Sequence, residues 1–457
     1  MYADIKNLSL TDAAQLIQKK QITAVELNAE CLKIYGQTKN LNAFTAVDQD
    51  YVLRQAKAID DKIAKGEKVG ALAGVPIGVK DNMSTEHYPT SCASGSLSNN
   101  VIPRTDASVV AKLRLADAIV FGKTNMDEFA MGFTSTNSFF GEVSNPYNTE
   151  YSAGGSSGGS AVAVSVGSVF GALGSDTGGS IRQPAANCGV CGLKPTFNSV
   201  SRDGMFPLSK TLDHIGCLAK NVRDTALMFN VIKKKEEDYS KCFKPHKPKL
   251  KVAYLDSFDN AFIDDDVYKA YTNAVDAIKR LGYKAEGISF EFSREIAQTY
   301  TVLCTTEAVE SFDFFNQLHP NSIVLDKCGK EVNKRIGFGK KILEEKDFNS
   351  INKAYLTREK VREQIADILD GYDVILSPTT LLRALKKHED IPNEKGFTSD
   401  LFSIVCNLTG IPALSIPMGF DGNGIPLGLQ IMATHDREED IFSIAYQTET
   451  ALKDGNI

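Results

Sequence analysis

Residues Tyr151 to Thr196, YSAGGSSGGSAVAVSVGSVFGALGSDTGGSIRQPAANCGVCGLKPT, hold glycine and small hydroxyl residues more densely than any other stretch of this sequence. Two turns lie within it, Gly154–Gly159 (GGSSGG) and Ser175–Ser180 (SDTGGS). Glycine tolerates a positive φ and has no Cβ, so the backbone of such turns can approach a ligand closely. Each turn could therefore present N–H groups to an anion.

The segment between the turns is apolar and built from small residues. Ala161–Val169 predicts a buried helix that leads into a short strand, Phe170–Gly174. A flexible Gly/Ser linker would not be interleaved with such an apolar run, so the linker interpretation is disfavoured. Backbone amides at a turn that feeds a helix are suited to holding an oxyanion. With Ser180 at the end of the second turn, the pattern indicates acyl transfer through a serine ester.

A serine nucleophile needs a base, and histidine is one candidate. Gly154–Gly158 fits the G-x-S-x-G pattern, which would make Ser156 the nucleophile and require a histidine such as His214 or His435. Such a nucleophile elbow also needs a strand directly before the serine. Residues 145–148 (NPYN) predict a turn instead, which argues against the elbow.

Lysine is the other candidate base. Residues 73–80 (AGVPIGVK) predict an apolar strand that ends at Lys80. A solvated lysine is almost fully protonated at pH 7, so Lys80 could act as a base only if its pKa fell by about three units, which costs about 4 kcal/mol. The alternative is that Lys80 has no catalytic role and that its side chain extends from the end of the strand into water. The residues alone leave both possibilities open.

The motifs around these residues resemble the amidase signature family. The resemblance is carried by residues 74–81 (GVPIGVKD), 154–160 (GGSSGGS) and 174–185 (GSDTGGSIRQPA), followed by 192–195 (GLKP). It extends from about residue 10 to about residue 450. Family members use a Ser–Ser–Lys triad. The resemblance therefore implies that Ser180 is the acyl-forming nucleophile.

The other site residues follow from the same resemblance. Ser156 would be the bridging serine, on a cis peptide bond, and Lys80 the neutral base. The resemblance also implies an oxyanion hole built from backbone N–H groups of the second turn, those of Thr177, Gly178 and Gly179.

Strands and helices alternate around these motifs. The sequence predicts a strand over Val75–Lys80, a helix over Ala107–Leu115 and a strand over Ala118–Gly122, the order of a doubly wound α/β sheet. Further on, it predicts a strand over Lys251–Leu255 and an amphipathic helix over Asp265–Leu281. The resemblance adds that the sheet is mixed and carries helices on both faces.

We expect a single large domain over residues 1–457. Its parts would be a helical N-terminal part over about 1–65, a catalytic core over about 70–220 and a substrate-pocket half over about 250–450. The charged, proline-bearing segment at about 233–249 is predicted to be a surface excursion.

Two local patterns refine this organisation. Thr23 and Glu26 form a capping-box pattern at the start of a helix. Residues 122–124 (GKT) resemble the end of a phosphate-binding loop, but Asp117 replaces its first glycine and apolar strand formers follow it. We therefore predict a strand and a turn there, with no ATP site in this chain.

Composition excludes several functional classes. The 457 residues are 42% hydrophobic and 24% charged with a net charge of −6, so no basic field favours nucleic acid. The nine scattered cysteines favour a reducing compartment, and Cys188 and Cys191 lack the second pair that a metal site needs. No apolar run approaches the 18 residues of a membrane span. The N-terminal residues show no targeting pattern, so we expect a cytoplasmic protein, with an organelle matrix as the alternative.

Within the family, the chain resembles the A-type subunits of glutamyl-tRNA(Gln) amidotransferases. This implies glutamine as the ammonia donor, partner subunits of the B type and of the C type or an equivalent, and Glu-tRNA(Gln) reached through the complex. It implies no cofactor in this chain, since ATP and Mg would be used by the partner. The alternatives are a stand-alone amidase for small amides and an inactive scaffold protein. Intact Lys80, Ser156 and Ser180 argue against the scaffold.

Three residues of the second half match the glutamine-binding pattern of these A-type subunits. They are Tyr300, Arg335 and Asp400. A guanidinium matches the α-carboxylate of glutamine, and a carboxylate accepts from its α-ammonium. The chain also departs from that pattern, in the residues that follow Glu307 and at Asp117, where a glycine is usual. These departures concern the pocket rim and leave the triad intact.

Overall fold

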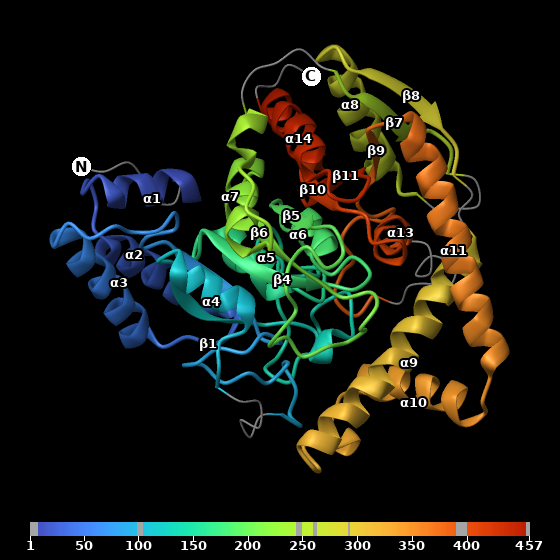
Figure 1. The fold of residues 1–457 in the computed structure, drawn as a ribbon, viewed down its shortest axis with the longest axis horizontal. Helices are drawn as coiled ribbons and strands as arrows, with labels where there is room; N and C mark the ends of the chain where they lie inside the picture. Colours follow the sequence, from blue (N-terminus) through green and yellow to red (C-terminus); the bar gives the residue numbers. More distant parts are fainter. Residues whose placement is uncertain are drawn as a thin grey trace.

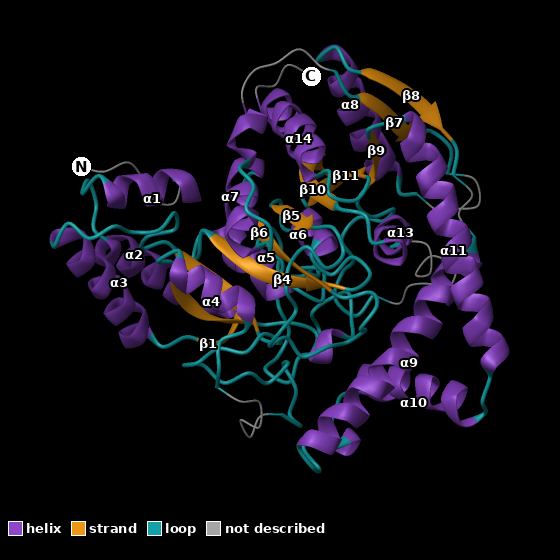
Figure 2. Ribbon diagram, viewed as in Figure 1, coloured by secondary structure: helices purple, strands orange, loops and turns teal. Residues whose placement is uncertain are grey.

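The computed structural model describes residues 8–97, 104–243, 249–258, 263–290, 293–389 and 400–453. It confirms the predicted α/β class (Figures 1 and 2). An 11-stranded sheet runs through the molecule in the order β1-β3-β2-β4-β6-β5-β10-β11-β9-β7-β8. Because the order departs repeatedly from the sequence, distant parts of the chain meet as neighbouring strands.

The strands are short. They are β1 Phe44–Ala46, β2 Pro76–Lys80, β3 Ile119–Thr124, β4 Gly171–Asp176, β5 Cys191–Lys194, β6 His214–Ala219, β7 Lys251–Leu255, β8 Lys284–Ile288, β9 Val374–Pro378, β10 Ala413–Phe420 and β11 Pro426–Ala433.

The helices range from one turn and a half to seven turns. They are α1 Leu10–Gln18, α2 Ala24–Gln37, α3 Gln49–Ala64, α4 Ser108–Leu115, α5 Gly158–Val166, α6 Arg182–Asn187, α7 Val222–Ile232, α8 Asp265–Arg280, α9 Arg294–Leu318, α10 Lys330–Glu344, α11 Phe348–Gly371, α13 Leu401–Thr409 and α14 Glu438–Lys453. None of the described helices combines the length and the apolar character needed to cross a membrane.

The sheet is mixed, as expected. β2 is parallel to both β3 and β4, and β7 is parallel to both β8 and β9, whereas every pair between β4 and β9 is antiparallel. The parallel strands β2 and β4 end at the same edge, which places Lys80 beside the turn that follows β4. This edge carries the candidate site.

Helices cover both faces of the sheet. On β9, Val374 and Leu376 belong to one hydrophobic cluster, while Ile375 between them belongs to another. Because successive strand residues point to opposite faces, the alternation shows that each face has its own core. Helices α8 and α14 pack on one face, and α9, α11 and α13 contribute to the core of the other. In Figure 1, α9, α10 and α11 lie at the far side of the molecule from α1 and α3.

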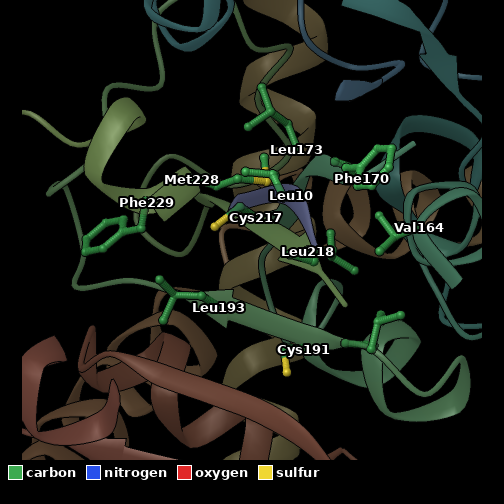
Figure 3. Packing of buried hydrophobic residues seen from close by; sticks show 14 of the residues in the cluster. Leu10, Val164, Phe170, Leu173, Cys191, Leu193, Cys217, Leu218, Met228 and Phe229 are labelled. Carbon is green, nitrogen blue, oxygen red and sulfur yellow. The ribbon is translucent and has the colours of Figure 1, made fainter. Parts of the chain in front are cut away.

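The larger core is built mostly from the first half of the chain. Figure 3 shows Leu173, Leu193 and Leu218 of the central strands with Phe170 and Phe229 around them. Most described residues of the segment 233–249 are exposed, but Lys233 and Tyr239 are buried, and Tyr239 packs against Phe229. Residues 244–248 lie outside the described part.

Three sequence expectations need correction. The N-terminal part is not helical throughout, since β1 lies between α2 and α3. Helix α5 begins at Gly158, so the second half of the GGSSGG turn is already helical. The GKT segment does not form a turn, because β3 continues to Thr124. The capping box at the start of α2 and the strand Lys251–Leu255 are confirmed.

Asp117, at the position where the resemblance leads us to expect glycine, adopts a left-handed conformation with φ 61°. Aspartate tolerates this region better than most residues. Its carboxylate accepts hydrogen bonds from the Gly70 amide at 2.7 Å and from Lys62 at 2.6 Å. These contacts compensate for the conformational cost that glycine would avoid.

Replacing Asp117 separates the two effects. Asp117→Ala keeps the unfavourable φ and loses both hydrogen bonds, so it should lower the free energy of unfolding by about 2 kcal/mol. Asp117→Gly loses the bonds but relaxes the backbone and should lie between alanine and wild type. Asp117→Asn keeps an acceptor and should lose the least. Urea unfolding of the three variants checks this order, and a glycine variant as stable as wild type would show that the hydrogen bonds contribute nothing.

Candidate active site

Lys80 is the last residue of β2 and lies at the edge of the sheet where β2 and β4 end. Its neighbours on both sides, β3 and β4, leave the side chain with no exposed surface. The Nζ atom forms hydrogen bonds with Ser156 Oγ at 2.7 Å and with Ser175 Oγ at 2.9 Å. Asn82 donates a further hydrogen bond to Ser175 Oγ, which fixes this hydroxyl. Lys80 is therefore held in place rather than extended to water.

Burial changes the protonation of Lys80. Desolvation lowers the pKa of Lys80 to about 7, although the carboxylates of Asp127, Asp176 and Asp213 oppose this shift. An amine with this pKa is largely neutral slightly above pH 7. Of the two possibilities that the sequence leaves open, the structure therefore favours the one in which Lys80 is available as a base.

Ser156 lies in the first glycine-rich turn and is fully buried. The peptide bond between Gly155 and Ser156 is cis, as the resemblance implies. The Gly155 amide donates to Gln183 Oε1 at 3.1 Å, and the Ser157 amide donates to the Ser180 carbonyl at 3.1 Å. The two turns are thus joined directly to each other.

The second turn is organised by Asp176. Its carboxylate accepts from the amides of Gly179 at 2.8 Å and Ile181 at 3.1 Å, and from the Arg182 guanidinium. Burial alone would raise the pKa of Asp176, but the adjoining Arg182 lowers it well below its usual range. Asp176 therefore stays ionised and shapes the turn that carries Ser180.

Glycine is required at two positions of this turn. A Cβ on Gly178 would lie 2.7 Å from the Tyr300 ring, and one on Gly179 would lie 2.5 Å from Ser403 Oγ. Gly179 also has a φ of 129°. Of the three predicted oxyanion donors, the Gly179 amide already donates to Asp176, whereas within the described residues the amides of Thr177 and Gly178 have no protein acceptor. The oxyanion role of these amides stays a prediction.

A small pocket of about 50 Å³ opens beside Ser180. Residues from both halves of the chain line it: Gly132, Phe133, Gly155, Gly178, Gly179, Ser180, Gln183, Tyr300, Arg335, Asp400 and Ile404. The structure thus gathers all three predicted glutamine-binding residues around Ser180. Arg335 lies on α10, where its Nε donates to Glu331 at 2.8 Å. Asp400 stands at the N-terminus of α13.

The two candidate histidines lie elsewhere. His214 is buried at the start of β6, where Nδ1 contacts the Leu212 carbonyl and Nε2 contacts Lys194 Nζ. Desolvation lowers the pKa of His214 well below its usual value, and desolvation also lowers the pKa of His435. Among the described strands, none directly precedes Ser156, so the strand–serine–helix arrangement of a nucleophile elbow is not formed there.

The cysteine pair considered as half of a metal site makes other contacts. Cys188 Sγ donates to the Ala153 carbonyl at 3.4 Å and Cys191 Sγ to Glu449 at 3.8 Å. The described residues contain no group of three or more metal-ligating side chains.

Sequence reasoning missed three residues of the site. Ser175 holds Lys80 and directly precedes Asp176 in the second motif, where its hydroxyl could have been noticed. Gln183 lines the pocket and also lies in that motif. Asp127 lies fully buried behind the first turn, and only its place in the loop after β3 hinted at it.

A family profile named Amidase matches residues 26–442. The chain belongs to the amidase signature family. Among curated relatives, it is 37% identical to the A subunit of glutamyl-tRNA(Gln) amidotransferase from Nostoc punctiforme, with 97% of each chain covered. It is 35% identical to the protein of the same name from Halothermothrix orenii, with 98% of each chain covered. The chain is an amidase-type enzyme, as these relationships show.

Solved structures of the family share the fold. The glutamyl-tRNA(Gln) amidotransferase A subunit from Thermotoga maritima superposes with a TM-score of 0.81 at 31% identity, over 100% of this chain and 96% of that one. A crystal structure described as an amidase gives a TM-score of 0.86 at 28% identity, over 97% of this chain and 99% of that one. The mixed sheet with helices on both faces is therefore the fold of this family.

The pH dependence of catalysis tests the state of Lys80. Since burial lowers the pKa of Lys80 to about 7 and only the neutral amine accepts a proton, activity should fall as the pH drops through this value. Lys80→Ala should remove this acid limb and roughly 10²- to 10⁴-fold of the rate. The rate of simple-amide hydrolysis is measured from pH 5.5 to 9. If His214→Ala or His435→Ala abolishes the limb and Lys80→Ala retains it, a histidine is the base.

Proposed function

We propose that this chain is the glutamine-hydrolysing component of a tRNA-dependent amidotransferase. One observation carries the proposal: Ser180 shares a small pocket with Arg335 and Asp400. Ser156 of the first turn forms a hydrogen bond with the buried Lys80, and its neighbour Ser157 is bonded to the Ser180 carbonyl. A cation and an anion suit the two charged ends of a free amino acid, and a serine beside them suits attack on its side-chain amide.

The mechanism begins with the neutral Lys80. As Ser180 Oγ attacks the amide carbon of glutamine, its proton passes through Ser156 Oγ to Lys80 Nζ. The resulting oxyanion is held by backbone amides of the second turn. Within the described residues, those of Thr177 and Gly178 have no protein acceptor that would compete for them. Collapse of the tetrahedral intermediate breaks the C–N bond, and the proton held by Lys80 returns to the leaving nitrogen. Ammonia leaves, and water then hydrolyses the glutamyl ester on Ser180.

The ammonia would be used by other subunits. Because the similar proteins are named as A subunits, we propose partners of the B type and of the C type or an equivalent. The partner would use ATP and Mg to convert Glu-tRNA(Gln) to Gln-tRNA(Gln). This chain would contribute no cofactor. All nine of its cysteines are free thiols, which fits the reducing cytoplasm that we propose as its location.

Covalent trapping tests the nucleophile. An acylating inhibitor should add once to the wild-type protein, and Ser180→Ala should abolish the adduct because the attacking oxygen is gone. Ser156→Ala should keep a weak, slow adduct, since Ser180 remains but has lost its proton relay. Intact-protein mass spectrometry with peptide mapping measures both. An adduct on Ser156 would instead favour the elbow mechanism.

Substrate selectivity tests the amidotransferase assignment. Arg335→Ala or Asp400→Ala would leave one charged end of glutamine unpaired in a partly desolvated pocket, which costs on the order of 2 to 4 kcal/mol, or roughly 30- to 1000-fold in kcat/KM. A simple amide such as propionamide contacts neither residue and should react equally well with the variants and the wild type. Asparagine keeps both charges but misplaces the amide, so it should bind and react slowly.

The kinetics are measured with partner subunits present. Equal losses on glutamine and propionamide would show that Arg335 and Asp400 support the structure only. High turnover of simple amides without any partner would then favour the stand-alone amidase. Absence of both activities in the complete assembly would favour the scaffold.

A further inference from the structure

Asp127 lies in the loop that follows β3, with no exposed surface. The loop runs along the back of the first glycine-rich turn. The backbone N–H of Asp127 donates to the carbonyl of Ser156 at 3.3 Å, and Asp127 Oδ2 accepts from the Ser135 amide at 3.0 Å. Asp127 therefore contacts the serine that binds Lys80.

Two glycines separate the Asp127 carboxylate from the pocket. A Cβ on Gly155 would lie 2.0 Å from Oδ2, and a Cβ on Gly132 would lie 2.3 Å from Cγ. Both glycines line the pocket beside Ser180. The backbone of these two glycines forms a wall between the carboxylate and the pocket. Because neither glycine has a side chain, the carboxylate lies as close to the pocket as the backbone permits.

The Asp127 carboxylate retains an unused acceptor. Its Oδ1 has no hydrogen-bond partner among the described residues. A buried carboxylate oxygen without a donor is unfavourable unless a nearby positive charge offsets its desolvation. Among the nearby charges, the cations of Lys80 and Arg335 lower the pKa of Asp127, and the carboxylate of Glu331 raises it.

The other carboxylates around Lys80 are already engaged. Four groups raise the pKa of Lys80 electrostatically: Asp127, Asp176, Asp213 and Cys92. Asp176 is paired with Arg182. Asp213 accepts from the Thr177 hydroxyl and from two backbone amides. Of these three carboxylates, Asp127 is the one with an oxygen that no described residue contacts through a hydrogen bond.

We propose that Asp127 is a positioning residue that holds the Ser156 peptide and supplies the counter-charge for the proton that Lys80 takes up. The inference rests on the proposed function, in which Lys80 gains a proton as Ser180 attacks. At that moment a buried cation forms whose direct contacts, within the described part of the chain, are neutral hydroxyl and carbonyl oxygens. The carboxylate behind the glycine wall offsets its cost, and it does so without contacting the substrate.

The charge of Asp127 also sets where Lys80 titrates. Burial raises the pKa of Asp127 to about 6, so the carboxylate is ionised at the pH at which Lys80 exchanges its proton. An anion nearby stabilises the protonated amine and hence raises the pKa of Lys80. Removing the anion lowers this pKa, so the neutral, active form of Lys80 would persist to lower pH.

The test uses Asp127→Asn, which keeps an acceptor for the Ser135 amide but removes the charge. The rate of covalent trapping of Ser180 by an acylating inhibitor is followed from pH 5 to 9. The midpoint of the acid limb should move down by about one pH unit, the smallest effect typical of a nearby opposite charge. The rate on the plateau should fall about tenfold, because the protonated lysine has lost its counter-charge. A purely structural role would lower the rate without moving the midpoint.

Glu449→Gln is the matched control. Glu449 is a buried carboxylate on α14 whose pKa is also raised by burial, and its contacts are Cys191, Val222 and Lys453. The Glu449→Gln variant should leave the midpoint of the acid limb at the wild-type value. A second variant, Gly132→Ala, keeps the Asp127 charge but forces the carboxylate to move. It should shift the midpoint, because the distance between the carboxylate and Lys80 changes.

The outcomes separate this inference from the proposed function. If wild-type protein forms no adduct at Ser180, or its adduct shows no acid limb, the proposed mechanism fails. If the wild-type limb is present and remains unshifted in whichever of Asp127→Asn and Gly132→Ala is recovered folded, only the role of Asp127 is overturned. A shift of equal size in Glu449→Gln would also overturn it, since any buried charge would then have the same effect.

Discussion

The burial of Lys80 is the constraint on which the rest of the site depends. Burying a charged ammonium group away from water costs several kcal/mol of free energy. Among the described residues, none forms a close ion pair with Lys80 that would offset this cost, so desolvation lowers the pKa of Lys80 to about 7. This outcome requires the amine to lie between strands, with neutral hydroxyls as its direct partners. Ser156 and Ser175 provide these hydroxyls, and the carboxylates that surround the amine stay out of direct contact.

The glycine-rich turns follow from the same constraint. Ser156 can reach Lys80 only if its turn packs against the loop that contains Asp127, and Gly155 leaves the space for that contact. On the other turn, Gly178 leaves the space for Tyr300, which comes from α9 in the second half of the chain. Each glycine thus marks a place where another part of the molecule approaches the backbone. The density of glycine in the sequence reflects packing on several sides rather than flexibility.

The sequence predicted the parts of the site that are local and missed those that depend on long-range packing. Lys80, Ser156 and Ser180 lie within motifs, and the strand that ends at Lys80 was visible as an apolar run with a terminal cation. Tyr300, Arg335 and Asp400 were found by resemblance alone, because single polar residues on helices have no local signal. Strand β1 has only three residues, and its pairing with β3 depends on a partner more than 70 positions away. Asp127 had only its place in the loop after β3 as a signal, since its significance comes from the absence of side chains on Gly132 and Gly155 in front of it.

The two halves of the site are held in register by a buried guanidinium. Arg182 begins α6 directly after the turn that carries Ser180 and forms an ion pair with Asp176. The same side chain donates to Gln430 on β11 and to the Ser403 carbonyl and Asn407 on α13. Helix α13 begins next to Asp400, so Arg182 links the turn that carries Ser180 to the helix that presents a proposed substrate ligand. An arginine suits this position because its planar group offers several donors in fixed directions, whereas a lysine would offer one point charge. The position of Asp400 relative to the turn that carries Ser180 is therefore set by contacts within the core.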